Sequence, residues 1–275
     1  MKGKTTLLII GIFIFSLSAS AGGKCEVGKG KCTVDNTATK HQTIETAELE
    51  KATGAGQENE NLTIEYELDI APIYSTPAGQ TYGRWAAEWW QWSFGIPEAV
   101  NPLLDMTGVN CNRRQVGKVW FLAGAFTPDP VVRNCTIPRG KSLFFPLINI
   151  SYGAFLNDPS EIRTEEYVRS IGSCTEPATI FAWIDGNRVQ HPTRYFTGVS
   201  GSQSPIFNIQ MPSSNLLGVT EADAPELVLS PSAEQGYYLF VEPLQRGNHT
   251  IRWIASGCTA GASQDITYRL TVVGN

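Results

Sequence analysis

Histidine and the usual metal-binding cysteine pairs are scarce in this sequence. The 275-residue chain has three histidines, His41, His191 and His249, which are far apart in the sequence. It contains no Cys-x-x-Cys pair, so the ligand spacing of a zinc site is missing. The G-x-x-x-x-G-K-[ST] loop that cradles phosphates is also absent. We therefore expect no metal site and no cofactor.

Clustered cations are equally rare. The formal net charge is −5, and the run of Lys24, Lys29 and Lys31 is a minor one. Binding to a phosphate backbone requires grouped Lys and Arg side chains that displace counterions. The composition therefore excludes a typical nucleic-acid-binding protein.

A long hydrophobic run is missing as well, apart from a short one at the N-terminus. Lys2 and Lys4 precede an apolar run at residues 7–15, and the small residues Ala19 and Ala21 follow it. This order is that of a signal peptide, and it predicts cleavage after Ala21. The run is shorter than the roughly 20 residues that span a bilayer. We expect a secreted or periplasmic protein with no membrane span after cleavage.

The six cysteines form an even set, which in an exported chain predicts three disulfides. Six cysteines allow 15 pairings, and the sequence alone cannot select one. Proximity along the chain favours Cys25–Cys32 and Cys111–Cys135, which leaves Cys174–Cys258.

Aromatic residues and proline are absent from residues 22–62, whereas every tryptophan lies between Trp85 and Trp253. A segment without large apolar side chains cannot bury enough surface to fold. We expect residues 22–62 to be a polar, disordered leader and residues 63–275 to form a single domain.

Within that domain, short β-type segments are separated by Pro, Gly and Asn. The pair Asp185–Gly186 is typical of a tight hairpin turn between two of them. The pattern predicts a mainly β fold, an antiparallel β-sandwich or jelly roll stapled by disulfides and decorated by two short helices. The expected strands are residues 64–70, 118–123, 142–149, 179–184, 188–191, 206–211, 237–242, 250–255 and 266–273.

The two expected helices span residues 82–94 and 160–171. Asp158 can cap the second helix and Pro159 can open it. The first helix is apolar almost all round, with a stripe that includes Trp85, Trp89 and Trp92.

That tryptophan-rich helix is the main candidate for a binding site. Trp89 and Trp92 could stack on a sugar ring, while Arg84, Glu88 and Gln91 offer polar groups that orient a ligand. The alternative is packing, in which the indoles fill the core and Arg84 pairs with Glu88 one turn later.

Glu88 with either Glu98 or Asp105 could supply the two carboxylates of a glycosidase. The separation of such carboxylates decides the reaction, at about 5 Å for retention and about 6.5–9.5 Å for inversion. Asp105 lies in a turn sequence, where a side chain that caps its own backbone is the simpler expectation. We assign no catalytic residue, and we expect His191 and His249 to be surface or strand histidines.

Several segments resemble a group of uncharacterised exported bacterial proteins over roughly residues 80–275. They include the tryptophan run WAAEWWQW, NPLLDMTGVNC, VWFLAG and PLQRGNHTI. The resemblance implies bacterial export and one shared domain, and it carries no known activity or catalytic residue.

Three hypotheses follow from the sequence. The first is a non-enzymatic binding module for a carbohydrate or a cell-surface component, with a glycan or an envelope component as partner. The alternatives are a carbohydrate-active hydrolase that uses Glu88 and a second carboxylate, and a structural or protein-interaction domain. An open cleft at the tryptophan-rich helix would favour the first two.

Overall fold

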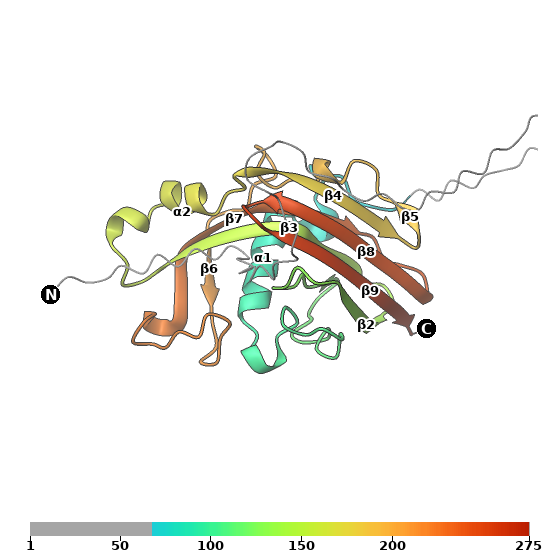
Figure 1. Ribbon diagram of the computed structural model, residues 1–275, viewed down its shortest axis with the longest axis horizontal. Helices are drawn as coiled ribbons and strands as arrows, with labels where there is room; N and C mark the ends of the chain where they lie inside the picture. Colours follow the sequence, from blue (N-terminus) through green and yellow to red (C-terminus); the bar gives the residue numbers. More distant parts are fainter. Residues whose placement is uncertain (1–67, 275) are drawn as a thin grey trace, which may run out of the picture. The chain divides into compact units, whose positions relative to one another are not determined.

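The computed structural model describes residues 68–274 (Figure 1). The expected signal peptide, the leader at residues 22–62 and the Cys25–Cys32 pairing lie outside these residues. Of the strand predicted at residues 64–70, residues 68–70 are described, and Ile70 forms an isolated bridge to Val241.

The described part of the chain is mostly β, as the sequence predicts, and its strands form two sheets (Figure 1). The four-stranded sheet has the order β1 (Val119–Phe121), β3 (Ser142–Phe155), β7 (Val228–Val241) and β6 (Phe207–Gln210). The five-stranded sheet has the order β2 (Val131–Pro138), β9 (Ser263–Val273), β8 (Gly247–Cys258), β4 (Glu176–Ile184) and β5 (Asn187–Arg188).

Most neighbouring strands run antiparallel, as expected, but two pairs at sheet edges are parallel. β1 pairs with β3, and β2 pairs with β9, in parallel register. Parallel strands need a crossover connection rather than a hairpin. β2 and β9 meet this requirement because residues 139–262, with strands β3 to β8, lie between them in the sequence.

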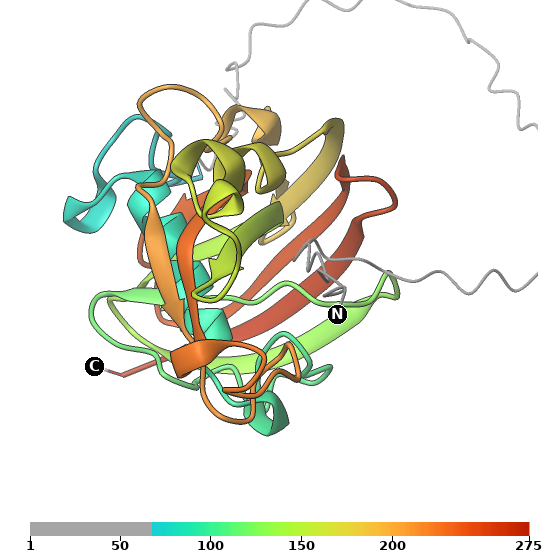
Figure 2. The same cartoon turned by 90° about the vertical axis from the view of Figure 1, so that its left-hand side faces the viewer.

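The four-stranded sheet is the middle of three layers (Figures 1 and 2). One of its faces packs on the five-stranded sheet, where the rings of Phe145 and Trp253 stack with centroids 5.1 Å apart. Its other face is covered by α1 (Tyr82–Phe94), whose indoles pack around Phe144 and Phe240. Because successive side chains of a strand point to opposite faces, β3 is buried almost throughout, which explains its continuous apolar sequence.

α1 begins and ends where the sequence predicts, and α2 (Glu165–Ile171) begins later than expected. Thr81 caps α1 by accepting a hydrogen bond from the backbone N–H of Arg84. Thr164, and not Asp158, caps α2, because Ser160–Ile162 after Pro159 forms a separate 3₁₀ turn. Capping by Thr164 requires extended backbone at that residue, so the two turns cannot merge into one helix.

Both disulfides that fall within the described residues pair as predicted. Cys111–Cys135 ties the loop before β1 to β2. Cys174–Cys258 ties the entry of β4 to the end of β8.

A buried arginine lies at the edge of the core between the sheets. Arg133 of β2 is 1% exposed, and its Nε donates to the carbonyl of Asp105 at 2.6 Å. Its Nη1 donates to the carbonyl of Ala123 and the hydroxyl of Tyr268, at 2.6 and 2.8 Å. Nη2 has no hydrogen-bond partner within residues 68–274. Arg133 therefore ties three separate segments together without a carboxylate partner.

A buried carboxyl group lies under α1. Tyr238 donates to Glu234 Oε2 at 2.7 Å, and its own hydroxyl accepts from Asn149 Nδ2 and Trp90 Nε1. Burial raises the pKa of Glu234 to about 7, although hydrogen bonds from Tyr238 and Thr197 act in the opposite direction. The tryptophan-rich helix is thus joined to β7 through a polar chain.

Candidate functional site

The structure places the indoles of the tryptophan-rich helix in the core. Trp89 and Trp92 are 1% and 6% exposed. Trp89 Nε1 donates to the carbonyl of Leu122, and Trp92 Nε1 donates to the carbonyl of Arg113, both at 2.9 Å. Because their polar atoms are satisfied and their rings are covered, these side chains serve the packing of α1.

The polar residues of the same helix lie at the surface and bind neighbouring protein groups. Gln80 connects two of them, since it donates to Glu88 Oε1 at 2.8 Å and accepts from Arg84 Nε at 3.1 Å. Gln91 donates to the carbonyl of Asn208. The expected Arg84–Glu88 contact is therefore replaced by a bridge through Gln80.

Asp105 is committed to its own loop. Its Oδ1 accepts from the backbone N–H groups of Thr107 and Gly108 and from the Thr107 hydroxyl, and its Oδ2 accepts from the N–H of Asn110. Burial acts to raise the pKa of Asp105, but these hydrogen bonds outweigh it and lower the pKa. A carboxylate held in this way does not suit the general acid of a glycosidase.

We expect Asp105→Asn to lower the free energy of unfolding by about 1–3 kcal/mol at pH 7. Both side-chain oxygens of Asp105 accept hydrogen bonds from backbone N–H groups. In the asparagine one of these oxygens is replaced by an NH₂ group, which is a donor and cannot accept from a backbone N–H. Urea unfolding of the two proteins measures the change. Asp129→Asn, at an exposed position in another loop, is the matched control, and equal stability of both variants would contradict the structural role.

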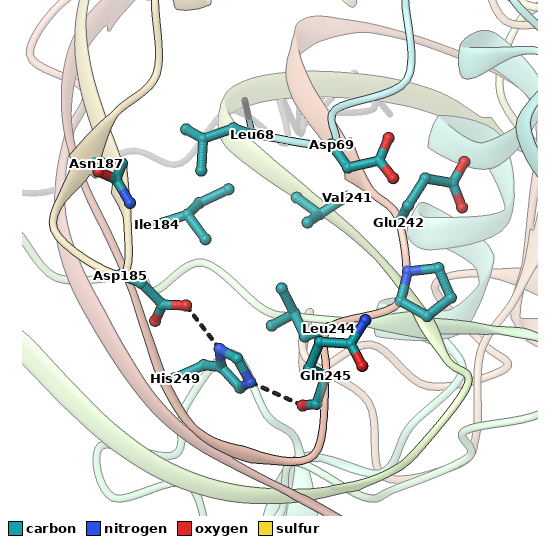
Figure 3. Close-up of a pocket in the computed structure, with 11 residues that line it drawn as sticks. Leu68, Asp69, Ile184, Asp185, Asn187, Val241, Glu242, Leu244, Gln245 and His249 are labelled. Carbon is teal, nitrogen blue, oxygen red and sulfur yellow. Dashed lines mark hydrogen bonds and ion pairs between the residues drawn. The ribbon is translucent and has the colours of Figure 1, made fainter. Parts of the chain in front are cut away.

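A pocket of about 560 Å³ opens at one end of the two sheets (Figure 3). Its volume falls within the usual range for small-molecule sites, about 300–1,000 Å³. Its floor is apolar and its rim is polar. The floor is formed by Leu68, Ile184, Val241 and Leu244, and the rim by Asp69, Asp185, Asn187, Glu242, Gln245 and His249.

These residues come from the β4–β5 hairpin, from residues 68–69 beside the end of β7, and from the turn that leads into β8. The β4–β5 hairpin supplies Asp185 and Asn187 through its turn, in which Asp185 and Gly186 both have positive φ, at 51° and 80°. This matches the tight turn that the pair predicts. Residues 68–69 are held beside the end of β7, where the N–H of Glu242 donates to the carbonyl of Asp69 at 2.9 Å.

His249 of β8 is fixed on both sides. Its Nδ1 lies 2.6 Å from Asp185 Oδ2, and its Nε2 lies 2.8 Å from the carbonyl of Gln245 (Figure 3). Carboxylate and carbonyl oxygens are both acceptors, so both bonds form when both ring nitrogens carry protons. The imidazole therefore braces the pocket wall, and neither nitrogen is free to act as a general base.

Asp69 and Glu242 lie together on the side of the pocket opposite the hairpin (Figure 3). Asp185 is occupied, since its Oδ1 accepts from the N–H of Thr250 at 2.7 Å and its Oδ2 contacts His249. Asp69 and Glu242 add two more carboxylates to the pocket lining, and Glu242 Oε2 accepts from the Ser142 hydroxyl at 3.2 Å. Their negative charge favours neutral or cationic ligands over anions.

Among residues 68–274, no group of three or more His, Cys, Asp or Glu side chains is arranged to hold a metal ion. No helix of the described chain is both long and apolar enough to cross a membrane.

Comparison with known proteins gives no family. No protein-family model and no curated protein matches the chain. Among solved structures, a family 123 glycoside hydrolase from Clostridium perfringens aligns over 52% of this chain and 23% of its own, at 10% identity and a TM-score of 0.22. A cysteine protease inhibitor from Entamoeba histolytica aligns over 52% of this chain and 86% of its own, at 15% identity and a TM-score of 0.18. Both likenesses are too weak to carry an argument.

Sequence reasoning missed this pocket. Its residues come from segments near positions 68, 185, 243 and 249, so no local motif joins them. The signal that was available was the Asp185–Gly186 turn, which placed a carboxylate at a hairpin tip. His249 was expected to be a strand histidine, and it does lie in β8, with both ring nitrogens occupied.

Proposed function

We propose that residues 63–275 form an exported binding domain whose pocket takes a carbohydrate. The observation that carries this proposal is the pocket's composition, with hydrogen-bonding side chains around an apolar floor. Sugars present hydroxyl groups at their edges and C–H groups on their ring faces, and this pairing of surfaces suits them. Carboxylate and amide groups such as Asp69, Glu242 and Asn187 can accept or donate hydrogen bonds to hydroxyls.

The charge of the pocket narrows the ligand class. Two carboxylates, Asp69 and Glu242, lie together at one edge of it (Figure 3). An amino sugar would add an ion pair to the hydrogen bonds, whereas a uronic acid would be repelled. We therefore propose a neutral or amino sugar as the occupant of the pocket.

Export completes the proposal. The signal-peptide pattern ending at Ala21 supports delivery across a bacterial membrane. The disulfides Cys111–Cys135 and Cys174–Cys258 fit the oxidising conditions outside the cytoplasm. We propose a periplasmic or secreted location, where glycans of the cell envelope are available as partners.

Titration calorimetry with glucosamine hexamer and N-acetylglucosamine hexamer tests the pocket. We expect both hexamers to bind, with the cationic glucosamine hexamer binding more tightly. The variant Asp69→Asn/Glu242→Gln should bind the glucosamine hexamer at least tenfold more weakly than the wild type. An ion pair lost in a partly enclosed pocket has about that effect, since 1.4 kcal/mol corresponds to a factor of ten.

Asp129→Asn is the control because it removes an exposed carboxylate outside the pocket. No heat of binding for either hexamer, or equal loss in this control, would contradict the proposal. Release of new reducing ends from the hexamers would instead indicate a hydrolase.

A further inference from the structure

The outer face of the five-stranded sheet carries a row of alternating cationic and aromatic side chains. Trp183 of β4 lies opposite Arg188 of β5 on one side and Arg252 of β8 on the other. Phe181 is the next outward residue of β4, and it stacks with Trp183 at a centroid distance of 6.3 Å and an interplanar angle of 21°. Both rings alternate with the core residues Ile180, Ala182 and Ile184, so they face away from the other sheet.

The aromatic rings hold the two guanidinium groups in place. Arg188 Cζ lies 5.3 Å from the centroid of the Phe181 ring, and Arg252 Cζ lies 5.9 Å from that of Trp183. Such cation–π contacts orient an arginine while leaving its N–H donors accessible at the edge. The Arg188 side chain makes no hydrogen bond within the described range, whereas Arg252 Nη2 donates to Asp265 Oδ1 and Oδ2 at 3.4 and 3.3 Å, so Nε and Nη1 are its donors left for a ligand.

Phe181 is 39% exposed, and this is unusual for a phenylalanine in the middle of a strand. Ile254 lies opposite Phe181, several other outward residues of β8 and β9 are hydroxylic, and one more cation, Arg269, stands on β9. Thr250, Ser256, Thr267 and Thr271 share this outward direction. Three arginines against Asp265 give this part of the face a positive charge on a chain whose formal net charge is −5.

We propose that this face binds an acidic polysaccharide, a polymer of uronic acid residues. Arg188 and Arg252 would bind carboxylates, because the guanidinium fork matches a carboxylate with two parallel N–H···O bonds. The neighbouring threonine and serine hydroxyls would exchange hydrogen bonds with those of the sugar. The flat sheet surface suits an extended chain that crosses several strands.

A single-stranded nucleic acid fits this face less well. It needs ring faces open for base stacking together with cations that follow its backbone. Here the arginines lie over the rings themselves, so the rings serve to position the cations.

This site is independent of the pocket. Trp183 and Ile184 are neighbours in β4 and point to opposite faces, so Ile184 lines the pocket while Trp183 stands on the outer face. The pocket is acidic and this face is basic, so the two would take ligands of different charge.

Affinity electrophoresis in gels containing polygalacturonate, with dextran gels as the neutral reference, tests the proposal. We expect retardation of the wild-type chain in polygalacturonate alone. Arg188→Gln/Arg252→Gln should weaken it at least tenfold and lessen its dependence on salt, because two cations fewer contact the polymer. Arg139→Gln, an exposed arginine at the end of β2, should leave it unchanged.

Further variants make the outcome decisive. Arg252→Lys keeps the charge but not the paired donors, so we expect an intermediate loss. Asp69→Asn/Glu242→Gln in the pocket should retain full retardation, which separates this proposal from the function proposed above. No retardation of the wild type, equal loss in Arg139→Gln, or tighter binding to single-stranded poly(dT) than to polygalacturonate would overturn it. Thermal melts verify that each variant is folded.

Discussion

Replacing Arg133 by methionine is expected to lower the free energy of unfolding by about 3 kcal/mol, and the melting temperature by roughly 6–12 °C. Methionine keeps the length and the apolar stem of the side chain but removes every donor. The carbonyl of Asp105, which accepts only from Arg133 among residues 68–274, would stay buried without a partner. Tyr268 would lose both a hydrogen bond and a cation over its ring.

An opposing effect makes this experiment informative. A buried cation without a carboxylate is costly to desolvate, and apolar replacement of buried charges sometimes stabilises a protein. We expect the three hydrogen bonds to outweigh that cost, because each involves a charged donor at 2.8 Å or less. Arg139→Met is the exposed control. A variant at Arg133 that is as stable as the wild type would show that desolvation wins.

Because the pKa of Glu234 is raised in the folded protein, we expect the free energy of unfolding to fall as the pH rises. The unfolded chain titrates this carboxyl near its ordinary value of 4.5, and the folded protein titrates it near 7. The folded state therefore binds more protons between these values, and its stability declines from about pH 4.5 to about pH 7. The difference corresponds to about 3 kcal/mol at 1.36 kcal/mol for each pH unit.

Glu234→Gln should remove this dependence. A neutral amide can still accept from Tyr238, so we expect the variant to match the wild type near pH 4.5 and to exceed its stability by about 3 kcal/mol at pH 8. Urea unfolding at a series of pH values measures both curves. Glu221→Gln, at an exposed position, is the control. A wild-type curve that is flat between pH 5 and 8 would refute the prediction. The Asp105 carboxylate has the opposite effect on stability. Because its pKa is lowered in the folded protein, its contribution to stability is lost as the pH falls, and only in more acid solution.

The parts of the fold that sequence predicted well are those where one local signal dominates. The tryptophan-rich helix has a capping threonine and an apolar surface nearly all round, and its bounds were predicted correctly. β2 was missed although its residues alternate between buried and exposed. The reason is Arg133, a charged residue at a position that faces the core, which hides the apolar period.

The first half of β7 was missed for a similar reason. Residues 228–236 contain Ser230, Pro231, Glu234 and Gln235, a composition typical of a loop. The Glu234 carboxyl accepts from Tyr238 in the same strand and from Thr197, and Asn149 of β3 donates to the Tyr238 hydroxyl. The contacts with Thr197 and Asn149 come from tertiary structure and are not visible in the local sequence. Both strand segments that the prediction missed therefore contain buried polar groups.

The candidate sites also depend on tertiary contacts that the local sequence does not show. The sequence singled out Arg84, Glu88, Trp89, Gln91 and Trp92 by residue type, and the structure gives the two indoles to the core. Whether a tryptophan is covered depends on the elements that pack over it, and the sequence of the helix cannot reveal this. The pocket depends on distant segments, whereas the outer row could have been found from the alternation within β4.

The alternation of β4 has one further consequence, for how this protein can change over time. Substitutions at Trp183 alter one candidate site and substitutions at Ile184 alter the other, so the two ligand specificities can diverge separately. An insertion or deletion of one residue in this strand would instead exchange the two faces and bring an indole to the core and an aliphatic side chain to the surface. Homologues of this domain should therefore vary in residue type at the outward positions of β4 while keeping its length constant.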